Sequence, residues 1–223
     1  MRLQEICAEQ RPREKALQQG IRSLTDIELL ALILGSGTRN RPVMDLAADV
    51  LKATSNLSKW PGCSPAAFMK ISGIREAKAL HLAASVDLAR RILKASVFSR
   101  HPFDLNEVLE WCQLEFGFSR QEQFAAVFLD TRGFVIASRV LTAGTQTESL
   151  VSIRDAFRAA LEEDAASVIF VHNHPSGDVS PSKQDLETTR ALQEAGKTMG
   201  ISVVDHLIVG KGSWLSMHHE GYM

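Results

Sequence analysis

The spacing of apolar residues changes near residues 97–102, and this change constrains the fold more than any other feature of the chain. Before it, apolar residues recur at intervals of three and four, the period of an amphipathic helix. After it, short apolar runs of strand length alternate with helical stretches, as in α/β proteins. The sequence therefore predicts a small all-α domain over residues 1–97 and an α/β domain over residues 102–223.

Three helices of the first domain can be placed from their apolar residues and their end signals. The first is predicted to follow an N-cap at Thr25 and to stop at Gly35, because hydroxyl side chains favour helix starts and glycine favours helix ends. The second follows Pro42. The third is the longest and is predicted to run from about Glu76 to Leu93.

The second domain is predicted to begin with a helix and a β-hairpin. Asp104 opens a helix with a sequence that resembles a capping box, and the helix ends near Gly117. The hairpin strands are Phe124–Leu129 and Phe134–Leu141. The elements expected after the hairpin are a helix at Ile153–Leu161, a strand at Ser167–Val171, a helix at about Lys183–Met199, and strands at Ile201–Val209 and Ser213–Met217. Strands interleaved with helices indicate a mixed sheet with helices packed on it.

The composition is that of an ordinary globular protein, with 45% hydrophobic and 23% charged residues. No apolar run reaches the roughly 18–20 residues that a membrane span needs, and the first residues lack the apolar core of a secretory signal. The three cysteines, Cys7, Cys63 and Cys112, form no C-x-x-C pair, which argues against a disulfide framework or a cysteine zinc site. We expect a cytoplasmic protein with no membrane partner; homo-oligomer formation stays open.

Charge is distributed unevenly along the chain. Residues 1–100 contain 16 Lys and Arg against 9 Asp and Glu, whereas residues 101–223 contain 9 against 17. A basic segment can attract phosphate backbones, and an acidic one would be repelled by them. The excess is spread out, so it fits either contact with nucleic acid by the first half or solvated charge without a partner.

A polar loop that follows an apolar strand contains the residues most suited to chemistry. From Val168 the sequence reads VIFVHNHPSGDVSPSKQD, with His172 and His174 two positions apart. In an extended chain such residues point to the same side, about 6–7 Å apart. Two imidazoles placed in this way can bind one metal ion at about 2.1 Å each. A His-x-His pair by itself is more often a pair of ordinary polar residues.

A carboxylate can join the two histidines from the helix that follows. If Ser182 caps that helix, Asp185 lies in its first turn, and the loop with Pro175, Gly177 and Pro181 can fold that turn back toward the strand end. Three protein ligands with one position left for water is the pattern of a catalytic zinc site. A Ser-x-x-Asp sequence alone is usually only a capping box, and here it can be both.

The complete string carries a family resemblance. His172-x-His174, seven residues, Ser182, two residues and Asp185 match the JAMM metalloprotease signature at every fixed position, and HNHPSGDVSPSKQD resembles the RadC family. The likeness continues in DHLIVG from Asp205, in FAAVFLDTRGFVI, in Ala143-Gly144-Thr145 and in the N-terminal RPREKALQQGIRSLTDIELLALILGSGT, so it spans nearly the whole chain. It implies a JAMM/MPN-type, cytidine-deaminase-like mixed sheet with flanking helices over residues 102–223.

The resemblance also implies roles for individual residues. It implies one Zn²⁺ held by His172, His174 and Asp185, with Glu122 moving the proton of a bound water and Ser182 donating a hydrogen bond to the oxyanion. Without the resemblance, Glu122 would be interpreted as an exposed glutamate at a helix end. The expected activity is zinc-dependent hydrolysis of amide bonds, peptide or isopeptide, with a peptide or protein as substrate.

Residues from about 65 to 93 resemble a helix-hairpin-helix, a module that offers backbone amides at a helix N-terminus to phosphate. Gly73 would occupy the tight turn, and Lys70, Arg75 and Lys78 would add positive charge. Arg75 stands where the usual motif has a second glycine, so its side chain would contact phosphate instead. Short hairpins of this kind also serve only to pack helices. Any contact with DNA would be independent of sequence and sensitive to salt.

Two other functions remain open at this point. The chain could be a DNA-associated accessory protein in repair or recombination whose zinc domain is a binding scaffold, or it could hydrolyse phosphodiesters, although such nucleases commonly use paired metals. Asp205-His206 fits a structural pair better than a fourth ligand or a partner of a ligand. Adjacent His218 and His219 would point to opposite faces of a strand and chelate poorly. Cys112 is expected to be core.

Overall fold

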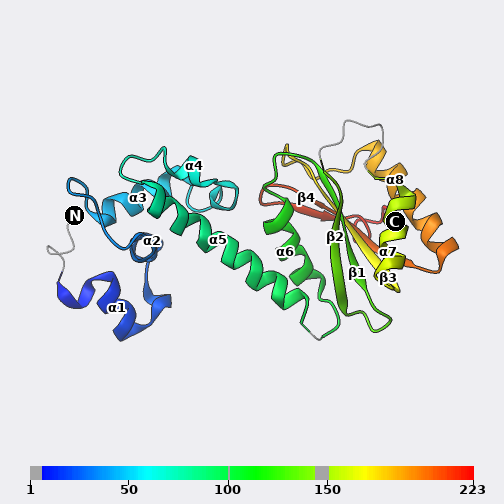
Figure 1. Cartoon of the computed structure of the whole chain (residues 1–223), viewed down its shortest axis with the longest axis horizontal. Coiled ribbons are helices and arrows are strands. Elements are labelled where there is room, and N and C mark those ends of the chain that lie inside the picture. Colours follow the sequence, from blue (N-terminus) through cyan, green and yellow to red (C-terminus); the bar gives the residue numbers. More distant parts are fainter. Residues whose placement is uncertain (1–6, 100, 144–150) are drawn as a thin grey trace. The chain divides into compact units, whose positions relative to one another are not determined.

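The computed structural model describes residues 7–99, 101–143 and 151–223, and it divides into two compact units, Met1–Ala89 and Arg90–Met223 (Figure 1). The predicted turn at Ala143-Gly144-Thr145 lies mostly outside the described residues. Among those residues, no helix is both long enough and apolar enough to cross a membrane.

The first unit is built of helices around one core, as predicted. Its elements are η2 (Ala8–Gln10), α1 (Pro12–Gln19), η3 (Ile21–Ser23), α2 (Asp26–Leu34), α3 (Val43–Ala53), η4 (Trp60–Gly62), α4 (Pro65–Phe68) and the first part of α5 (Glu76–Val97). Leu46, Val50 and Leu82 are fully buried in this core. The predicted N-cap of α2 is confirmed: the Thr25 hydroxyl accepts from the Glu28 N–H while the Glu28 carboxylate accepts from the Thr25 N–H, and α2 ends before Gly35.

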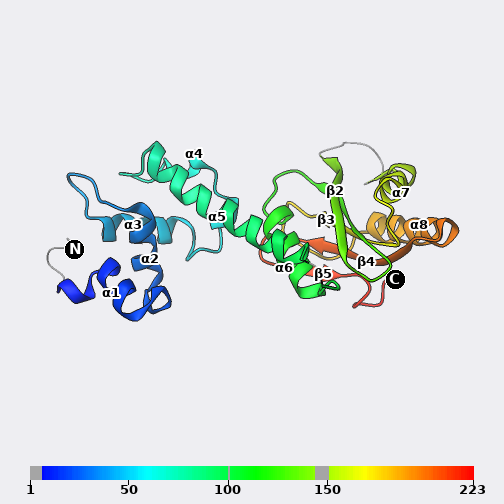
Figure 2. The same cartoon turned by 60° about the horizontal axis from the view of Figure 1, so that its bottom comes forward.

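The second unit is a five-stranded mixed sheet with helices on it, which confirms the predicted fold class (Figure 2). The elements after α5 are α6 (Leu105–Phe116), β1 (Gln123–Leu129), β2 (Val135–Ala143), α7 (Ile153–Glu162), β3 (Ser167–Asn173), α8 (Lys183–Met199), β4 (Ser202–Val209) and β5 (Trp214–Ser216). The strand order is β2-β1-β3-β4-β5. Only β3 and β4 are parallel neighbours among these strands, because α8 carries the chain back between them.

The units divide inside α5, before the change in apolar spacing at residues 97–102. Leu93 and Val97 pack with Trp111 in the core of the second unit, and the Arg90 side chain donates to the Leu114 carbonyl at 2.9 Å. The last turns of α5 therefore belong to the α/β unit. A helical period marks where a helix continues, but it does not indicate which core the helix joins.

The sheet separates two apolar layers in the second unit. α6 and the end of α5 cover one face, where Ala125, Val127 and Leu129 point. α7 and α8 cover the other face, where Phe124, Ala126 and Phe128 point (Figure 1). β1 and β3 are thus buried on both sides, which explains why their sequences are continuous apolar runs. The side chains that carry the candidate chemistry lie on the α8 face.

The start of α6 differs in detail from the prediction. Asp104 caps the helix by accepting from the N–H of Asn106 at 2.7 Å, whereas a capping box would use Glu107, three residues on. The Glu107 carboxylate instead lies 3.5 Å from Nε2 of His101. The cap still satisfies an otherwise unpaired N–H of the first turn, so the helix begins where the sequence predicted.

Candidate metal centre

His172 is fixed at the carboxyl end of β3 by the sheet itself. It pairs with Phe124 of β1 in the antiparallel register, and it is completely buried. Its ring is stacked beside the Phe124 ring, with centroids 6.0 Å apart and planes 9° from parallel. A buried ring stacked in this way has few rotamers open to it, so the direction of its Nε2 atom is fixed.

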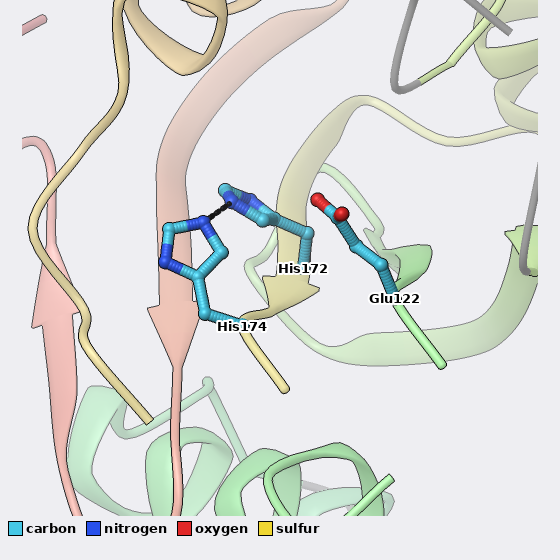
Figure 3. A group of neighbouring side chains, drawn as sticks. All are labelled: Glu122, His172 and His174. Carbon is cyan, nitrogen blue, oxygen red and sulfur yellow. Dashed lines mark hydrogen bonds between the residues drawn. The ribbon is translucent and has the colours of Figure 1, made fainter. Parts of the chain in front are cut away.

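His174 lies just beyond the strand and is held by hydrogen bonds from both its backbone and its ring. Its N–H donates to the Val209 carbonyl at 2.9 Å. Its Nδ1 lies 2.5 Å from the Asp178 carbonyl, and since a carbonyl can only accept, Nδ1 must carry the proton. The neutral ring therefore has its lone pair on Nε2, which lies 3.0 Å from Nε2 of His172 (Figure 3).

The loop after His174 is seated on the chain that follows β4. Gly177 has a φ of +91°, and a Cβ on Gly210 would come within 2.8 Å of the Gly177 carbonyl oxygen. The hydroxyl of Ser213 also donates to that oxygen. Both glycines are needed, the first for its left-handed backbone and the second for the close approach.

Asp185 reaches the two rings from the first turn of α8. Ser182 and Asp185 form a capping box, in which the Ser182 hydroxyl accepts from the Asp185 N–H and the Asp185 carboxylate accepts from the Ser182 N–H at 2.6 Å. The carboxylate oxygens lie 3.1 Å from Nε2 of His172 and 3.6 Å from Nε2 of His174. The structure thus brings the three predicted ligand side chains together.

Glu122 stands at the open side of this group. It precedes β1 and is exposed, and its carboxylate turns toward the histidine rings (Figure 3). Among the described residues, ligand atoms of Glu122, His172 and His174 lie within 4.8 Å of one another and form a group that could hold a metal ion. The structure therefore places the predicted proton carrier beside the predicted ligands.

Asn173 fixes the backbone on both sides of Glu122. Its side-chain oxygen accepts from the N–H of Gln123 at 2.9 Å, and its amide nitrogen donates to the carbonyl of Gln121 at 3.2 Å. Asn173 is completely buried on the sheet face opposite to His172. Sequence analysis did not identify this residue, although its place between the two histidines was a signal that could have been used.

Three pKa values are shifted at the centre. Burial would raise the pKa of Asp185, but hydrogen bonds with the His172 and His174 rings hold it well below its ordinary value. The hydrogen bond with Asp185 raises the pKa of His174. Burial lowers the pKa of His206 well below its ordinary value, and the neighbouring His172 adds to this effect. The carboxylate is thus ionised, and His206 is neutral.

Asp205 and His206 have separate roles, although they are adjacent. The Asp205 carboxylate accepts from the N–H groups of His206 and His218 and from the Ser216 hydroxyl, and it contacts no histidine ring in any of these bonds. Nε2 of His206 lies 2.8 Å from Nδ1 of His172. The structural role that the sequence analysis favoured for the pair therefore holds for Asp205 alone. His206 is a partner of a ligand candidate, the less favoured alternative.

Thr189 was also missed from the sequence. It lies one turn after Asp185 on α8, and its hydroxyl is 2.6 Å from both Nδ1 of His206 and the carbonyl of Asp185. No local pattern marks a threonine within a helix as part of a site. Its partners are apparent only in the structure, where Thr189 is completely buried.

The donor set fits a divalent cation. Both rings of the His172–His174 pair turn a nitrogen toward the same point, and the oxygens of Asp185 lie beside them. Two nitrogens bound tetrahedrally at 2.0–2.1 Å to one zinc ion would be about 3.3 Å apart, close to the 3.0 Å observed here. Two lone pairs at this distance would repel each other unless a cation lies near them.

The four candidate DNA-contact residues have different surroundings, and their contact with DNA stays a prediction. Lys70 and Arg75 are exposed. Gly73 has a φ of +90°, and a Cβ there would come within 2.7 Å of the Leu46 side chain, so the turn needs glycine for packing. The Lys78 ammonium donates to the carbonyls of Leu34 and Ser36 at 2.9 and 2.7 Å, so it stabilises the end of α2.

Cys112 lies in the core, as predicted. It is completely buried, and burial raises the pKa of its thiol. His218 and His219 lie in a turn after β5, not on a strand as the sequence analysis assumed. Both are exposed, and their backbone N–H groups bond to Asp205 and Ser216.

Comparison with known proteins decides the family. Residues 103–222 match the RadC-like JAB domain, and residues 3–80 match the UPF0758 N-terminal family. The chain belongs to the RadC family. UPF0758 proteins of Bacillus licheniformis and Listeria monocytogenes are each 37% identical to it, over 100% of both chains. A UPF0758 protein of Methanosarcina mazei is 35% identical over 100% of this chain and 97% of its own.

The RadC assignment agrees with the two units of the structure. The JAB match covers the sheet, the loop with His174 and all of α8, and the N-terminal match ends within α5. The group that could hold a metal ion therefore lies inside the JAB domain of this RadC protein.

Proposed function

We propose that this RadC protein is a zinc-dependent hydrolase of amide bonds, acting on a peptide or isopeptide linkage. The observation that supports this function best is the position of Glu122. An exposed carboxylate from the chain just before β1 stands beside two histidines whose Nε2 atoms converge with Asp185. A purely structural metal site has no need for such an additional carboxylate at its open side.

Each residue has a distinct task in this proposal. His172, His174 and Asp185 would hold the ion. Zinc bound there would act as a Lewis acid and lower the pKa of a bound water toward 7. Glu122 would take the proton of the attacking water and deliver it to the leaving amine nitrogen, which must be protonated to depart.

Ser182 is suited to bind the carbonyl oxygen of the substrate. Its hydroxyl oxygen accepts from the Asp185 N–H, and accepting this bond leaves the O–H able to donate. A hydroxyl can therefore cap α8 and also donate to a developing oxyanion.

The number of carboxylates favours amides over phosphodiesters. The three converging side chains are two imidazoles and one carboxylate, and the next acid, Glu122, lies where it can act as a base. Phosphodiester hydrolysis commonly uses two ions about 3.5–4 Å apart, which require several bridging carboxylates. A single ion with a nearby base is sufficient for the attack of water on an amide.

The test compares two variants of the full chain loaded with zinc. Glu122→Gln keeps the size of the side chain but removes its basicity, so amidase activity on fluorogenic peptide and isopeptide substrates should fall by about 10²–10⁴-fold. Zinc content measured by mass spectrometry should stay at one per chain. His174→Ala should lose both zinc and activity. Full activity of Glu122→Gln with zinc bound would refute the proposal.

A further inference from the structure

Three buried polar groups form a row behind His172. The Asp185 main-chain carbonyl is 2.6 Å from the Thr189 hydroxyl, which is 2.6 Å from Nδ1 of His206. Nε2 of His206 is in turn 2.8 Å from Nδ1 of His172. Thr189, His172 and His206 are all completely buried, so water cannot replace any of these bonds.

The direction of the first bond follows from the carbonyl. The Asp185 carbonyl oxygen can only accept, and two oxygens in contact at 2.6 Å require a hydrogen between them. The single hydrogen of the Thr189 hydroxyl therefore points to Asp185. The thioether of Met217, 3.3 Å from the same hydroxyl, is a much weaker acceptor and does not compete for it.

The direction of the remaining bonds follows from the first. Because the Thr189 hydrogen is used, its oxygen must accept from Nδ1 of His206, which carries the proton of that neutral ring. Nε2 of His206 is then a bare lone pair, and it must accept from Nδ1 of His172. The neutral His172 ring is left with its own lone pair on Nε2, the atom that faces His174 and Asp185.

We propose that Thr189 and His206 are positioning residues that fix the tautomer of His172, so that the neutral ring carries its proton on Nδ1 and offers an unprotonated Nε2 to the metal ion. This inference rests on the proposed zinc site. α8 thus supplies both a direct ligand, Asp185, and the start of the hydrogen-bond chain that prepares a ligand on β3. Partners of this kind typically change metal affinity by 10–100-fold when they are removed.

The decisive variant is Thr189→Val, with Thr189→Ser as its matched control. Valine has the shape of threonine but no hydroxyl, so His206 loses the acceptor of its Nδ1 proton. The His206 proton should move to Nε2 and point at His172, which then carries its proton on the nitrogen that faces the metal. Zinc affinity, measured by competition with a chromogenic chelator, should fall by about 10–100-fold. Serine keeps the hydroxyl, and its affinity should stay within about threefold of the wild type.

A second readout needs neither zinc nor activity. Long-range ¹H–¹⁵N NMR of the zinc-free protein distinguishes a proton on Nδ1 from one on Nε2 of each histidine. We expect His206 to carry its proton on Nδ1 in the wild type and in Thr189→Ser, and on Nε2 in Thr189→Val.

The two measurements separate this inference from the proposed function. A wild-type His206 with its proton on Nε2 would overturn the inference, as would a folded Thr189→Val that binds zinc as tightly as the wild type. A wild-type protein without amidase activity would contradict the proposed function alone. If Thr189→Val does not fold, the wild-type NMR spectrum still decides between the two tautomers.

Discussion

Replacing Asn173 with alanine tests how the structure positions Glu122. The side chain makes two hydrogen bonds, one to the N–H of Gln123 and one to the carbonyl of Gln121. These backbone groups lie immediately before and after Glu122 in the chain. Without Asn173, the Gln121 carbonyl keeps only the Ser119 hydroxyl, at 2.8 Å, and the Gln123 N–H loses its side-chain acceptor, so the carboxylate should lose its fixed position.

The expected loss of stability can be worked out from these two bonds. A backbone group left without a partner costs about 1–3 kcal/mol when it is buried. The Gln121 carbonyl keeps the Ser119 hydroxyl as a donor, at 2.8 Å, so only the Gln123 N–H is left without its side-chain partner. Gln123 is half-buried, so water can reach this group in part. We expect Asn173→Ala to lower the free energy of unfolding by about 1 kcal/mol, the low end of that range.

The effect on activity should exceed what this loss of stability explains. A displacement of about 1 Å in a reacting group can cost about 100-fold in rate, and Glu122 would be free to move by that much. Val168→Ala is the matched control. It removes a completely buried side chain from the same strand, at the end where β3 pairs with Phe128, far from His172. Its loss of stability should be at least as large, about 2 kcal/mol.

Both variants should be measured by urea unfolding and by steady-state amide hydrolysis with zinc present. We expect kcat to fall about 10- to 100-fold in Asn173→Ala and by less than twofold in Val168→Ala, with zinc content unchanged in both. Equal activity in the two variants would show that Asn173 supports the fold and does not position Glu122. An unfolding free energy within 0.5 kcal/mol of wild type would refute the hydrogen-bond reasoning itself.

Two further predictions concern pH and Lys78. The raised pKa of His174 means that, in the zinc-free protein, its ion pair with Asp185 stabilises the fold below about pH 6.5 and is lost as the pH rises through the raised value. The lowered pKa of Asp185 means that its contribution to the stability of the fold is present above about pH 4 and is lost in acid. Zinc must displace the His174 proton, so the zinc-induced rise in unfolding temperature should be larger at pH 7.5 than at pH 5.5, and an equal rise at both would contradict this ligand assignment. Lys78→Met should speed hydrogen exchange of the α2 amides, because a charged donor is lost from the helix end. The increase in rate should correspond to about 1.5–3 kcal/mol. Lys70 is exposed, and Lys70→Met should leave the exchange rate unchanged.

Local patterns in the sequence predicted most of the elements, whereas the ligand candidates needed the family resemblance as well. Thr25 and Gly35 mark the two ends of α2 because a helix cap depends on residues within one turn. His172, His174 and Asp185 lie within fourteen residues, so the strand, loop and helix turn between them almost determine their meeting. The same holds for Ser182, whose cap acts over three residues.

The residues that the sequence did not assign depend on partners that are distant in the chain. The bonds of Lys78 to the end of α2 could not be predicted from its neighbours in the chain, because its acceptors lie 42 and 44 residues away. The end of α5 joins the second core only because Leu93 and Val97 meet Trp111. Periodicity describes one element at a time and cannot supply such pairings.

The position of His206 shows how the register of the sheet determines the partners of a side chain whose role the sequence did not settle. The parallel pairing of β3 with β4 places His206 beside Phe170, on the face that α8 covers. A buried imidazole has two polar nitrogens, and each must find a partner or cost about 1–3 kcal/mol. His172 and Thr189 supply those partners. The crossover through α8 fixes this register. Because the buried His206 ring must then bond to both Thr189 and His172, the packing of the sheet determines which nitrogen of His172 a metal ion would meet.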